Sequence, residues 1–249
     1  MTEPDVLVRP APEPDRTVAY GPAPEHLADV WLPAAQSGRP LVLLVHGGFW
    51  RPAYDRAHTR PMAAALRDAG WPVASLEYRR VPGHPDVTTG DVRRAVEVLP
   101  GQAGSAGTVL VGHSAGGHLV LWAAATCPPE GLLGTVALAP VADLALAEQA
   151  DLGRGAVTAF LGAAANTRRD LDPVRGSSPA TPVILVHGAD DHEVPLDTSR
   201  SYLRAHPAAS LDELPATGHY ELIDPLAPAF ARLLNALDLL TRQDKKNTL

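Results

Sequence analysis

Residues 109–121, VLVGHSAGGHLVL, place one serine between two glycines where an apolar run meets a helix-prone segment. The apolar run predicts a buried strand, and residues 118–125 predict a helix. Gly112 and Gly116 bracket Ser114 in a GxSxG spacing, which a sharp strand-to-helix turn needs because side chains at the two bracketing positions would collide. A serine in such a turn is exposed above the sheet at a helix N-terminus, where free N–H groups favour negative charge. The stretch therefore predicts Ser114 as a nucleophile.

Strand and helix signals alternate along the rest of the chain. Residues 41–45, LVLLV, are apolar without interruption, as expected for a strand that is buried on both faces of a parallel sheet. This alternation predicts the α/β class, with a mostly parallel central sheet, helices on both faces and functional groups at the carboxyl ends of the strands. The expected strands are 17–20, 27–32, 41–45, 73–76, 108–111, 134–138, 182–186 and 210–214, and the expected helices are 60–69, 86–99, 118–125, 144–150, 155–161, 196–205 and 222–240.

The predicted organisation is one domain over residues 17–241, without a composition break that would divide it. Residues 1–16 are rich in Pro, Glu and Asp, which predicts a mobile or loosely packed arm. Residues 144–179 form a connection longer than an ordinary crossover, and we expect a short helical cap there. Residues 242–249 are polar and are expected to form a frayed tail.

Composition excludes several classes of partner. The 249 residues carry a formal net charge of -7, whereas nucleic acids and anionic membranes are bound by basic surfaces. No apolar run approaches the roughly 20 residues that span a bilayer, and the N-terminus lacks the basic and apolar segments of a signal peptide. A single cysteine, Cys127, fits a reducing compartment, so we expect a cytoplasmic protein in which this thiol is incidental. The sequence does not decide between a monomer and a homodimer.

A second candidate for chemistry is His46-Gly47-Gly48, which follows the buried 41–45 strand. Acyl transfer forms an oxyanion, and glycines let backbone N–H groups approach it closely. The N–H groups of Gly48 or Phe49 could act together with that of Ala115. We interpret His46 as a structural hydrogen-bonding residue, not a base. Trp50 is either a wall of the acyl pocket or part of the core.

A serine nucleophile needs a base and an acid that orients the base. Asp190 and Asp191 follow the 182–186 strand, and His219 follows the 210–214 strand, so these loops should meet Ser114 at one edge of the sheet. The competing interpretations are a helix N-terminal or turn role for either aspartate and a solvent-exposed loop role for His219. Five further histidines have no catalytic context: His26, His58, His84, His192 and His206.

Four separated motifs, HGGFW, GHSAGGHL, HGADDHEVP and TGHY, resemble the α/β-hydrolase superfamily from about Val18 to Leu240. The HGGxW form, the GHSAGG turn, Tyr20-Gly21 and Asp29-Val30 resemble the kynurenine formamidase (arylformamidase) and related esterase branch, with hormone-sensitive-lipase-like esterases as close relatives. Phe49 departs from that branch, which often has tyrosine there. The resemblance implies an α/β-hydrolase fold and no metal or organic cofactor. It maps the catalytic roles onto Ser114, Asp191 and His219 and the oxyanion turn onto Gly47, Gly48 and Phe49, and we expect Ala115 to complete the oxyanion hole. The residues expected to bind substrate are Phe49, Trp50, His113 and Tyr220.

These residues lead to one main hypothesis and two alternatives. The main hypothesis is a serine hydrolase of a small acyl amide or ester, with an arylformamide such as N-formylkynurenine as the preferred small-molecule substrate. A general carboxylesterase acting on short-chain esters is the first alternative. The second is a protein without catalytic activity that keeps the hydrolase pocket to bind a small molecule. The complete set of three candidate catalytic residues favours an enzyme.

Overall fold

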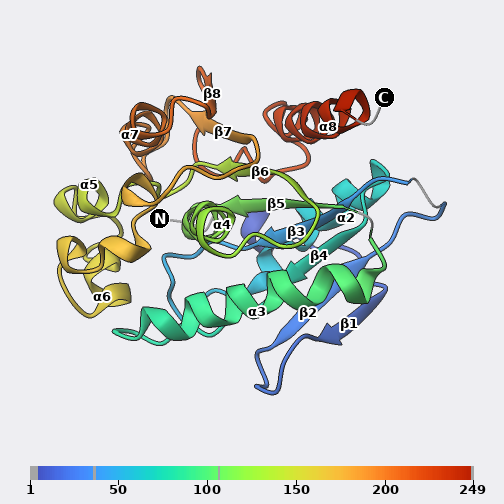
Figure 1. Ribbon diagram of the computed structural model, residues 1–249, viewed down its shortest axis with the longest axis horizontal. Coiled ribbons are helices and arrows are strands. Elements are labelled where there is room, and N and C mark those ends of the chain that lie inside the picture. Colours follow the sequence, from blue (N-terminus) through green and yellow to red (C-terminus); the bar gives the residue numbers. More distant parts are fainter. Residues whose placement is uncertain (1–4, 36–37, 106, 248–249) are drawn as a thin grey trace.

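A computed structural model describes residues 5–35, 38–105 and 107–247. In this part of the chain, eight strands form one sheet in the order β1-β2-β4-β3-β5-β6-β7-β8 (Figure 1). The strands are β1 (Arg16–Ala19), β2 (Leu27–Trp31), β3 (Leu41–Val45), β4 (Val73–Leu76), β5 (Thr108–His113), β6 (Leu132–Leu138), β7 (Val183–Gly188) and β8 (Ser210–Leu214). Strand β2 is antiparallel to both of its neighbours, and all pairs from β4 to β8 are parallel.

The central strands are buried on both faces, as the apolar runs predict. In β3, Leu41, Leu43 and Val45 join one hydrophobic core, whereas Val42 and Leu44 join the other. This division follows from the two-residue side-chain period of a strand. A continuous apolar run therefore places two separate cores on the two faces of the sheet.

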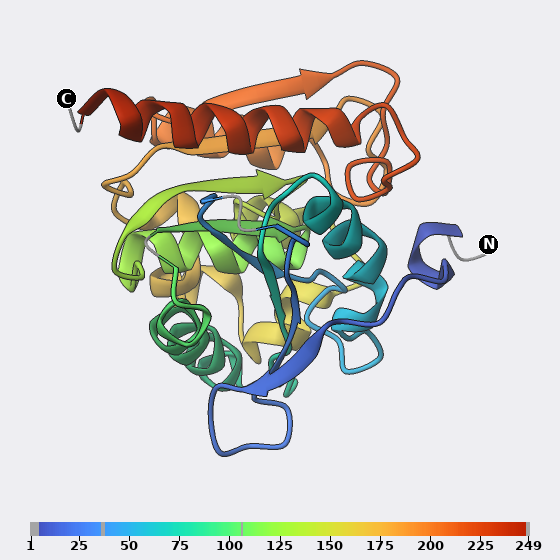
Figure 2. The same ribbon diagram turned by 90° about the vertical axis from the view of Figure 1, so that its right-hand side faces the viewer.

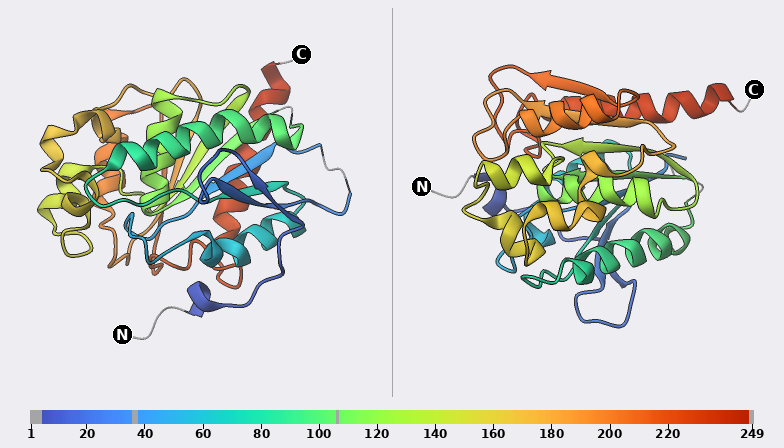
Figure 3. Two further views of the ribbon diagram at one scale, coloured as in Figure 1. Left: turned by 90° about the horizontal axis from the view of Figure 1, so that it is seen from below. Right: turned by 60° about the vertical axis from the view of Figure 1, so that its left-hand side comes forward.

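Helices cover both faces, which confirms the α/β class. One core contains residues of α3 (Pro85–Ala103), α4 (Ala115–Thr126) and α7 (Asp197–Ala205), and the other contains residues of α2 (Arg60–Asp68) and α8 (Phe230–Asn247). The left view of Figure 3 shows α3 above the sheet and α2 below it. Among the described residues, no helix is both long enough and apolar enough to cross a bilayer.

The predicted insertion contains two short helices, α5 (Leu144–Gln149) and α6 (Ala156–Leu161). Three 3-10 turns follow before β7, η2 (Ala165–Thr167), η3 (Arg169–Leu171) and η4 (Pro173–Arg175), and a further turn, η1 (Arg56–Thr59), precedes α2. Helix α5 begins where the Asp143 carboxylate accepts a hydrogen bond from the Leu146 N–H. Both short helices lie together beyond one end of the sheet (Figure 1).

The expected closing helix over 222–240 is wrong at its start. Residues 221–229 form turns, and α8 begins at Phe230, two residues after Pro228. Pro225 and Pro228 lack the N–H that a helix interior needs, so they interrupt the apolar pattern that suggested an earlier start. The helix continues to Asn247, so most of the expected polar tail is helical, and residues 248–249 lie outside the described residues.

The N-terminal segment is packed against the domain, whereas its composition predicted a mobile or loosely packed arm. Residues 5–8 form the short helix α1 (Asp5–Val8), visible at the N-terminal end of the chain in Figure 2. Val6 is 3% exposed and belongs to the core that includes Met62 of α2. An ion pair joins Arg9 to Asp224. The apolar and charged residues between the prolines hold the segment in place, and residues 1–4 lie outside the described residues.

Candidate functional site

Ser114 occupies the turn between β5 and α4 in a strained conformation. Its backbone angles are φ 57° and ψ −120°, and its side chain precedes the first turn of α4. The Ser114 N–H donates to Leu138 O at 2.9 Å, and the Ser114 carbonyl accepts the His118 N–H at 3.1 Å. A non-glycine residue with positive φ costs free energy, so the surrounding structure must hold it there.

The glycines around Ser114 are required by close backbone contacts. A Cβ on Gly112 would lie 2.8 Å from the Gly117 nitrogen and still closer to the Gly116 carbonyl. A Cβ on Gly116 would lie 2.7 Å from the carbonyl carbon of Val45 and would overlap its oxygen. The sharp turn thus packs α4 directly on the ends of β3 and β5.

The turn after β3 lies against Ser114. A Cβ on Gly47 would be 3.1 Å from the Ser114 Cβ. Gly48, Phe49 and Trp50 all have positive φ, at 108°, 54° and 54°. Three such residues in sequence are unusual, and backbone strain of this kind is concentrated at functional sites.

His46 stabilises this turn through hydrogen bonds and ring stacking, as expected for a structural residue. It is fully buried, and its Nδ1–H donates to the Gly47 carbonyl at 2.7 Å while Nε2 lies 3.1 Å from Glu77 Oε1. The Tyr78 ring stacks on His46 at 4.3 Å, and its hydroxyl donates to the His46 carbonyl at 2.9 Å. Burial alone would raise the pKa of Glu77, but the hydrogen bonds and charges of His46 and Arg80 hold it below its usual range.

Sequence reasoning missed this support. The signal was present in Glu77-Tyr78-Arg79-Arg80, a polar run placed directly after the apolar 73–76 strand. A charged residue at the carboxyl end of a strand faces the edge where functional groups gather. Glu77 is only 4% exposed, and a buried charge requires the partners that His46 and Arg80 supply.

Asp191, not Asp190, contacts His219. The His219 Nδ1 lies 2.7 Å from Asp191 Oδ2, while Asp191 Oδ1 accepts the N–H groups of Glu193 and Val194 at 2.8 Å each. Asp190 is exposed. Burial alone would raise the pKa of Asp191, but hydrogen bonds from His187 and His219 outweigh it and keep the carboxylate ionised.

Comparison with known proteins finds a matching family model and similar enzymes. The BD-FAE family model matches residues 28–138, which include the His46 and Ser114 turns. Esterase LipC from Mycobacterium tuberculosis (strain H37Rv) is 28% identical over 88% of this chain and 64% of its own length. A kynurenine formamidase from Danio rerio is 36% identical, over 41% of this chain and 36% of its own length. This chain therefore spans less than two thirds of either relative.

The fold comparison covers nearly the whole chain. The crystal structure of esterase B from Lactobacillus rhamnosis superposes with a TM-score of 0.80 and 18% identity, over 98% of this chain and 92% of that one. The chain has the α/β-hydrolase fold. The strand order and the strand-turn-helix around Ser114 are those of this fold.

Two of the residues predicted to bind substrate are buried. Trp50 is 3% exposed, and its ring stacks on that of Phe160 in α6 at 4.6 Å. It is therefore a core residue through which α6 packs against the turn after β3. His113 is 3% exposed, and its Nε2–H donates to the His219 carbonyl at 3.1 Å. Burial and the nearby His219 hold the pKa of His113 well below the usual histidine range, so its ring stays neutral.

Phe49 and Tyr220 keep part of their surface exposed. The Phe49 ring packs toward Gly153 in the cap loop, where a Cβ would be 2.8 Å from the ring. The Tyr220 ring lies 5.0 Å from the His219 ring, edge to face. Phe49 follows β3 and Tyr220 follows β8, so both lie in loops at the carboxyl edge of the sheet, and their role in substrate binding stays a prediction.

The five histidines without a catalytic context lie away from Ser114 in sequence and make structural contacts or are exposed. His26 pairs with Asp91 at 2.7 Å, and His206 contacts Ser178 at 2.8 Å and the Pro173 carbonyl at 2.9 Å. His84 precedes α3 and His192 is exposed, whereas the His58 ring lies edge-on to His46 at 5.6 Å. Burial raises the pKa of the Cys127 thiol, which suits an unreactive cysteine. Within the described residues, no group of three or more His, Cys, Asp or Glu side chains is arranged to hold a metal ion.

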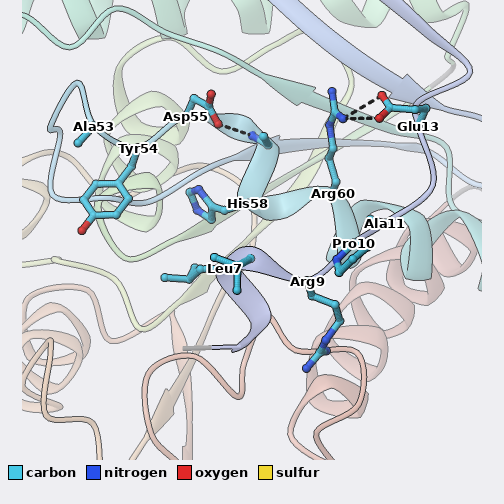
Figure 4. Close-up of a pocket in the computed structure, with 12 residues that line it drawn as sticks. Leu7, Arg9, Pro10, Ala11, Glu13, Ala53, Tyr54, Asp55, His58 and Arg60 are labelled. Carbon is cyan, nitrogen blue, oxygen red and sulfur yellow. Dashed lines mark hydrogen bonds and ion pairs between the residues drawn. The ribbon is translucent and has the colours of Figure 1, made fainter. Parts of the chain in front are cut away.

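A hollow of about 480 Å³ lies beside the β3 turn (Figure 4). One wall comes from the N-terminal segment with Leu7 and Arg9, and the other from the η1 region with Tyr54, His58 and Arg60. A Cβ on Gly48 would lie 2.8 Å from Tyr54 Cγ, so the hollow and the strained turn share a wall. Burial lowers the pKa of His58 to about 4, and this histidine is neutral at physiological pH.

Proposed function

We propose that this protein is a serine hydrolase that cleaves a small acyl ester or amide through an acyl-enzyme. One observation carries the proposal. A serine in a strained turn at a helix N-terminus shares an edge of the sheet with a histidine whose Nδ1 is held 2.7 Å from a buried carboxylate. This is the combination of nucleophile, base and orienting acid that acyl transfer requires.

The proposed reaction has two halves. Ser114 Oγ attacks the substrate carbonyl while His219 Nε2 takes the hydroxyl proton, and the N–H groups of Ala115 and of Gly48 or Phe49 stabilise the oxyanion. His219 then gives the proton to the leaving alcohol or amine, and the carbonyl–leaving group bond breaks. Water, deprotonated by His219, attacks the acyl-serine. His219 then returns this proton to Ser114 Oγ as the ester bond breaks, which releases the acid and restores the free serine. Asp191 holds the imidazole in the Nδ1–H tautomer throughout.

As the preferred substrate we propose an arylformamide such as N-formylkynurenine. The local similarity to a kynurenine formamidase and the HGGFW sequence support this choice. Phe49 and Tyr220 offer aromatic surface to an aryl group. A formyl group is the smallest acyl group, and it suits a site in which Trp50 is committed to packing against the cap.

A carboxylesterase acting on short-chain esters is the second candidate. The observation in its favour is the similarity to an esterase, which is 28% identical over 88% of the chain. Both candidates use the same proposed catalytic residues and differ in the leaving group. An amine leaves less readily than an alcohol, so formamide cleavage depends more on proton donation by His219.

The deciding experiment compares kcat/KM on N-formylkynurenine with that on p-nitrophenyl acetate and butyrate. Ser114→Ala should lower each active rate by at least about 10³-fold, whereas Ser177→Ala, at an exposed serine, should leave it unchanged. A strong formamide preference supports the arylformamidase, and ester turnover without formamide cleavage supports the carboxylesterase. Undiminished turnover in Ser114→Ala would refute the serine mechanism.

The non-catalytic alternative is tested by covalent labelling. A fluorophosphonate probe should label the folded wild type at Ser114 and leave Ser114→Ala unlabelled, because phosphonylation needs an activated hydroxyl. Absence of labelling, together with no turnover of the three substrates, would favour a binding protein.

A further inference from the structure

The Asp191 carboxylate has two imidazoles on one oxygen. His219 Nδ1 lies 2.7 Å from Oδ2, and His187 Nε2 lies 3.3 Å from the same Oδ2. The other oxygen, Oδ1, accepts two backbone N–H groups. The Asp191 and His187 side chains are both fully buried. A second imidazole against the orienting acid is not required by the proposed reaction.

The protonation of His187 follows from its other contacts. Its Nε2 lies 3.0 Å from the Val194 carbonyl, which can only accept, so Nε2 carries the hydrogen. Its Nδ1 lies 2.7 Å from the Ser199 hydroxyl and accepts that hydrogen in the neutral ring. Ser199 is fully buried in α7, so this helix favours the tautomer whose Nε2–H donates to the Val194 carbonyl, with Asp191 Oδ2 3.3 Å from the same nitrogen.

We propose that His187 is a positioning residue that acts through Asp191: its Nε2–H shares Oδ2 with His219, fixes the carboxylate and limits how tightly His219 holds a proton. This inference rests on the proposed function, in which His219 must both take and release the proton. An acceptor oxygen that already receives one N–H is a weaker partner for a second. Ser199 acts one step further away, by keeping the hydrogen on Nε2.

Other titratable groups face these residues from neighbouring elements. The His113 ring lies 4.4 Å from the His219 ring, and Tyr220 lies edge-on to it. Glu213 of β8 interacts electrostatically with His187, and the Glu221 carboxylate lies beside Gly218. None of these groups is altered in the variants below. A change in the pH profile would therefore report on the His187 contact.

The test is the pH dependence of kcat/KM on p-nitrophenyl acetate for wild type, His187→Phe, His187→Gln and Ser199→Ala. His187→Phe keeps a ring but has no donor, so Asp191 binds the charged His219 more strongly. The acid limb should move to higher pH by at least about 0.5 unit. Ser199→Ala removes one of the two groups that keep the hydrogen on Nε2 and leaves the Val194 carbonyl as the other, so it should shift the limb in the same direction by less. His187→Gln, whose amide can donate to Asp191, should recover most of the wild-type profile.

A purely structural role gives a different result. It would lower kcat in all three variants and leave the acid limb within about 0.2 unit of wild type, and that outcome would overturn the proposal. If His187→Phe does not fold, Ser199→Ala decides alone, because it removes only one hydroxyl.

Failure of the proposed function is distinguishable from failure of this inference. If the wild type hydrolyses no ester or formamide, the NMR titration of the His219 ring in wild type and Ser199→Ala provides the measurement. A higher titration midpoint in the variant supports the His187 contact without any turnover. Equal midpoints overturn it.

Discussion

At the scale of single residues, the Ser114 turn requires glycines, because neighbouring backbone atoms occupy the space that a Cβ would need. Gly112 and Gly116 contribute no side chain, and their lack of a Cβ lets α4 contact the ends of β3 and β5. Gly117 is similarly close to Pro140, where a Cβ would be 2.8 Å from the Pro140 Cβ. The GxSxGG pattern is therefore a packing requirement as well as a conformational one.

We expect Gly116→Ala to destabilise the fold by at least about 3 kcal/mol, since its Cβ would overlap backbone that cannot move without shifting β3. The matched control is Gly90→Ala in α3, where a Cβ meets nothing within 4 Å. That change should stabilise by about 0.5–1 kcal/mol through lower entropy of the unfolded chain. Urea denaturation of both variants measures the difference. Similar effects at the two sites would contradict this account of the turn.

At the scale of elements, helix α4 connects the Ser114 turn to the cap. It is apolar on all sides, and its one histidine, His118, is fully buried. The His118 Nε2–H donates to the Leu171 carbonyl in η3 at 2.8 Å, and the ring lies edge-on to Trp50 at 5.2 Å. Burial lowers the pKa of His118 to about 4 because the charged form would lose its hydration.

This buried histidine should make stability depend on pH. The unfolded chain protonates His118 near pH 6.5 and the folded protein only near pH 4, so the unfolded state binds more protons between these values. Its contribution is present above pH 6.5 and is lost as the pH falls toward 4. In His118→Gln, the loss of unfolding free energy between about pH 7 and about pH 4.5 should be smaller by about 2.5 kcal/mol. Denaturant titrations at both pH values measure it, with the exposed His192→Gln as control. An unchanged pH slope in His118→Gln would show that the buried ring is not the source.

At the scale of the whole molecule, the N-terminal segment joins parts that are far apart in sequence. Val6 belongs to the core that also contains residues of α2 and α8. Arg9 forms an ion pair with Asp224, which lies in the loop between His219 and α8. Glu13 pairs with Arg60 at 2.8 Å. The segment therefore supports both the hollow beside the β3 turn and the loop that carries the proposed base.

Two valines of α1 test this packing. Val6 is 3% exposed and Val8 is 61% exposed, so the same substitution in one short helix should have different effects. Val6→Ala should cost about 1–2 kcal/mol of unfolding free energy. Val8→Ala should change it by less than about 0.5 kcal/mol. Thermal or urea denaturation distinguishes them. Equal, small effects would mean that the segment contributes nothing to the fold.

The fold class and the order of the candidate site residues could be predicted from local sequence because they depend on local physics. Apolar runs of strand length, the GxSxG spacing and the HGG turn each reflect constraints within a few residues of chain. The strand set matches the structure, with ends displaced by at most two residues. The start of the last helix was missed because its apolar period continues through Pro225 and Pro228, and the prolines end it locally.

Contacts between distant segments were decided only by the tertiary structure. The residues alone left Asp190 and Asp191 open, and Asp191 meets His219 because β7 and β8 pair in parallel with Gly188 opposite Leu214. Trp50 became a core residue because α6 brings Phe160 over it, and Glu77 reaches His46 because β4 lies beside β3. Such contacts depend on which elements pack together, and the sequence pattern of one segment does not specify which distant segments will contact it.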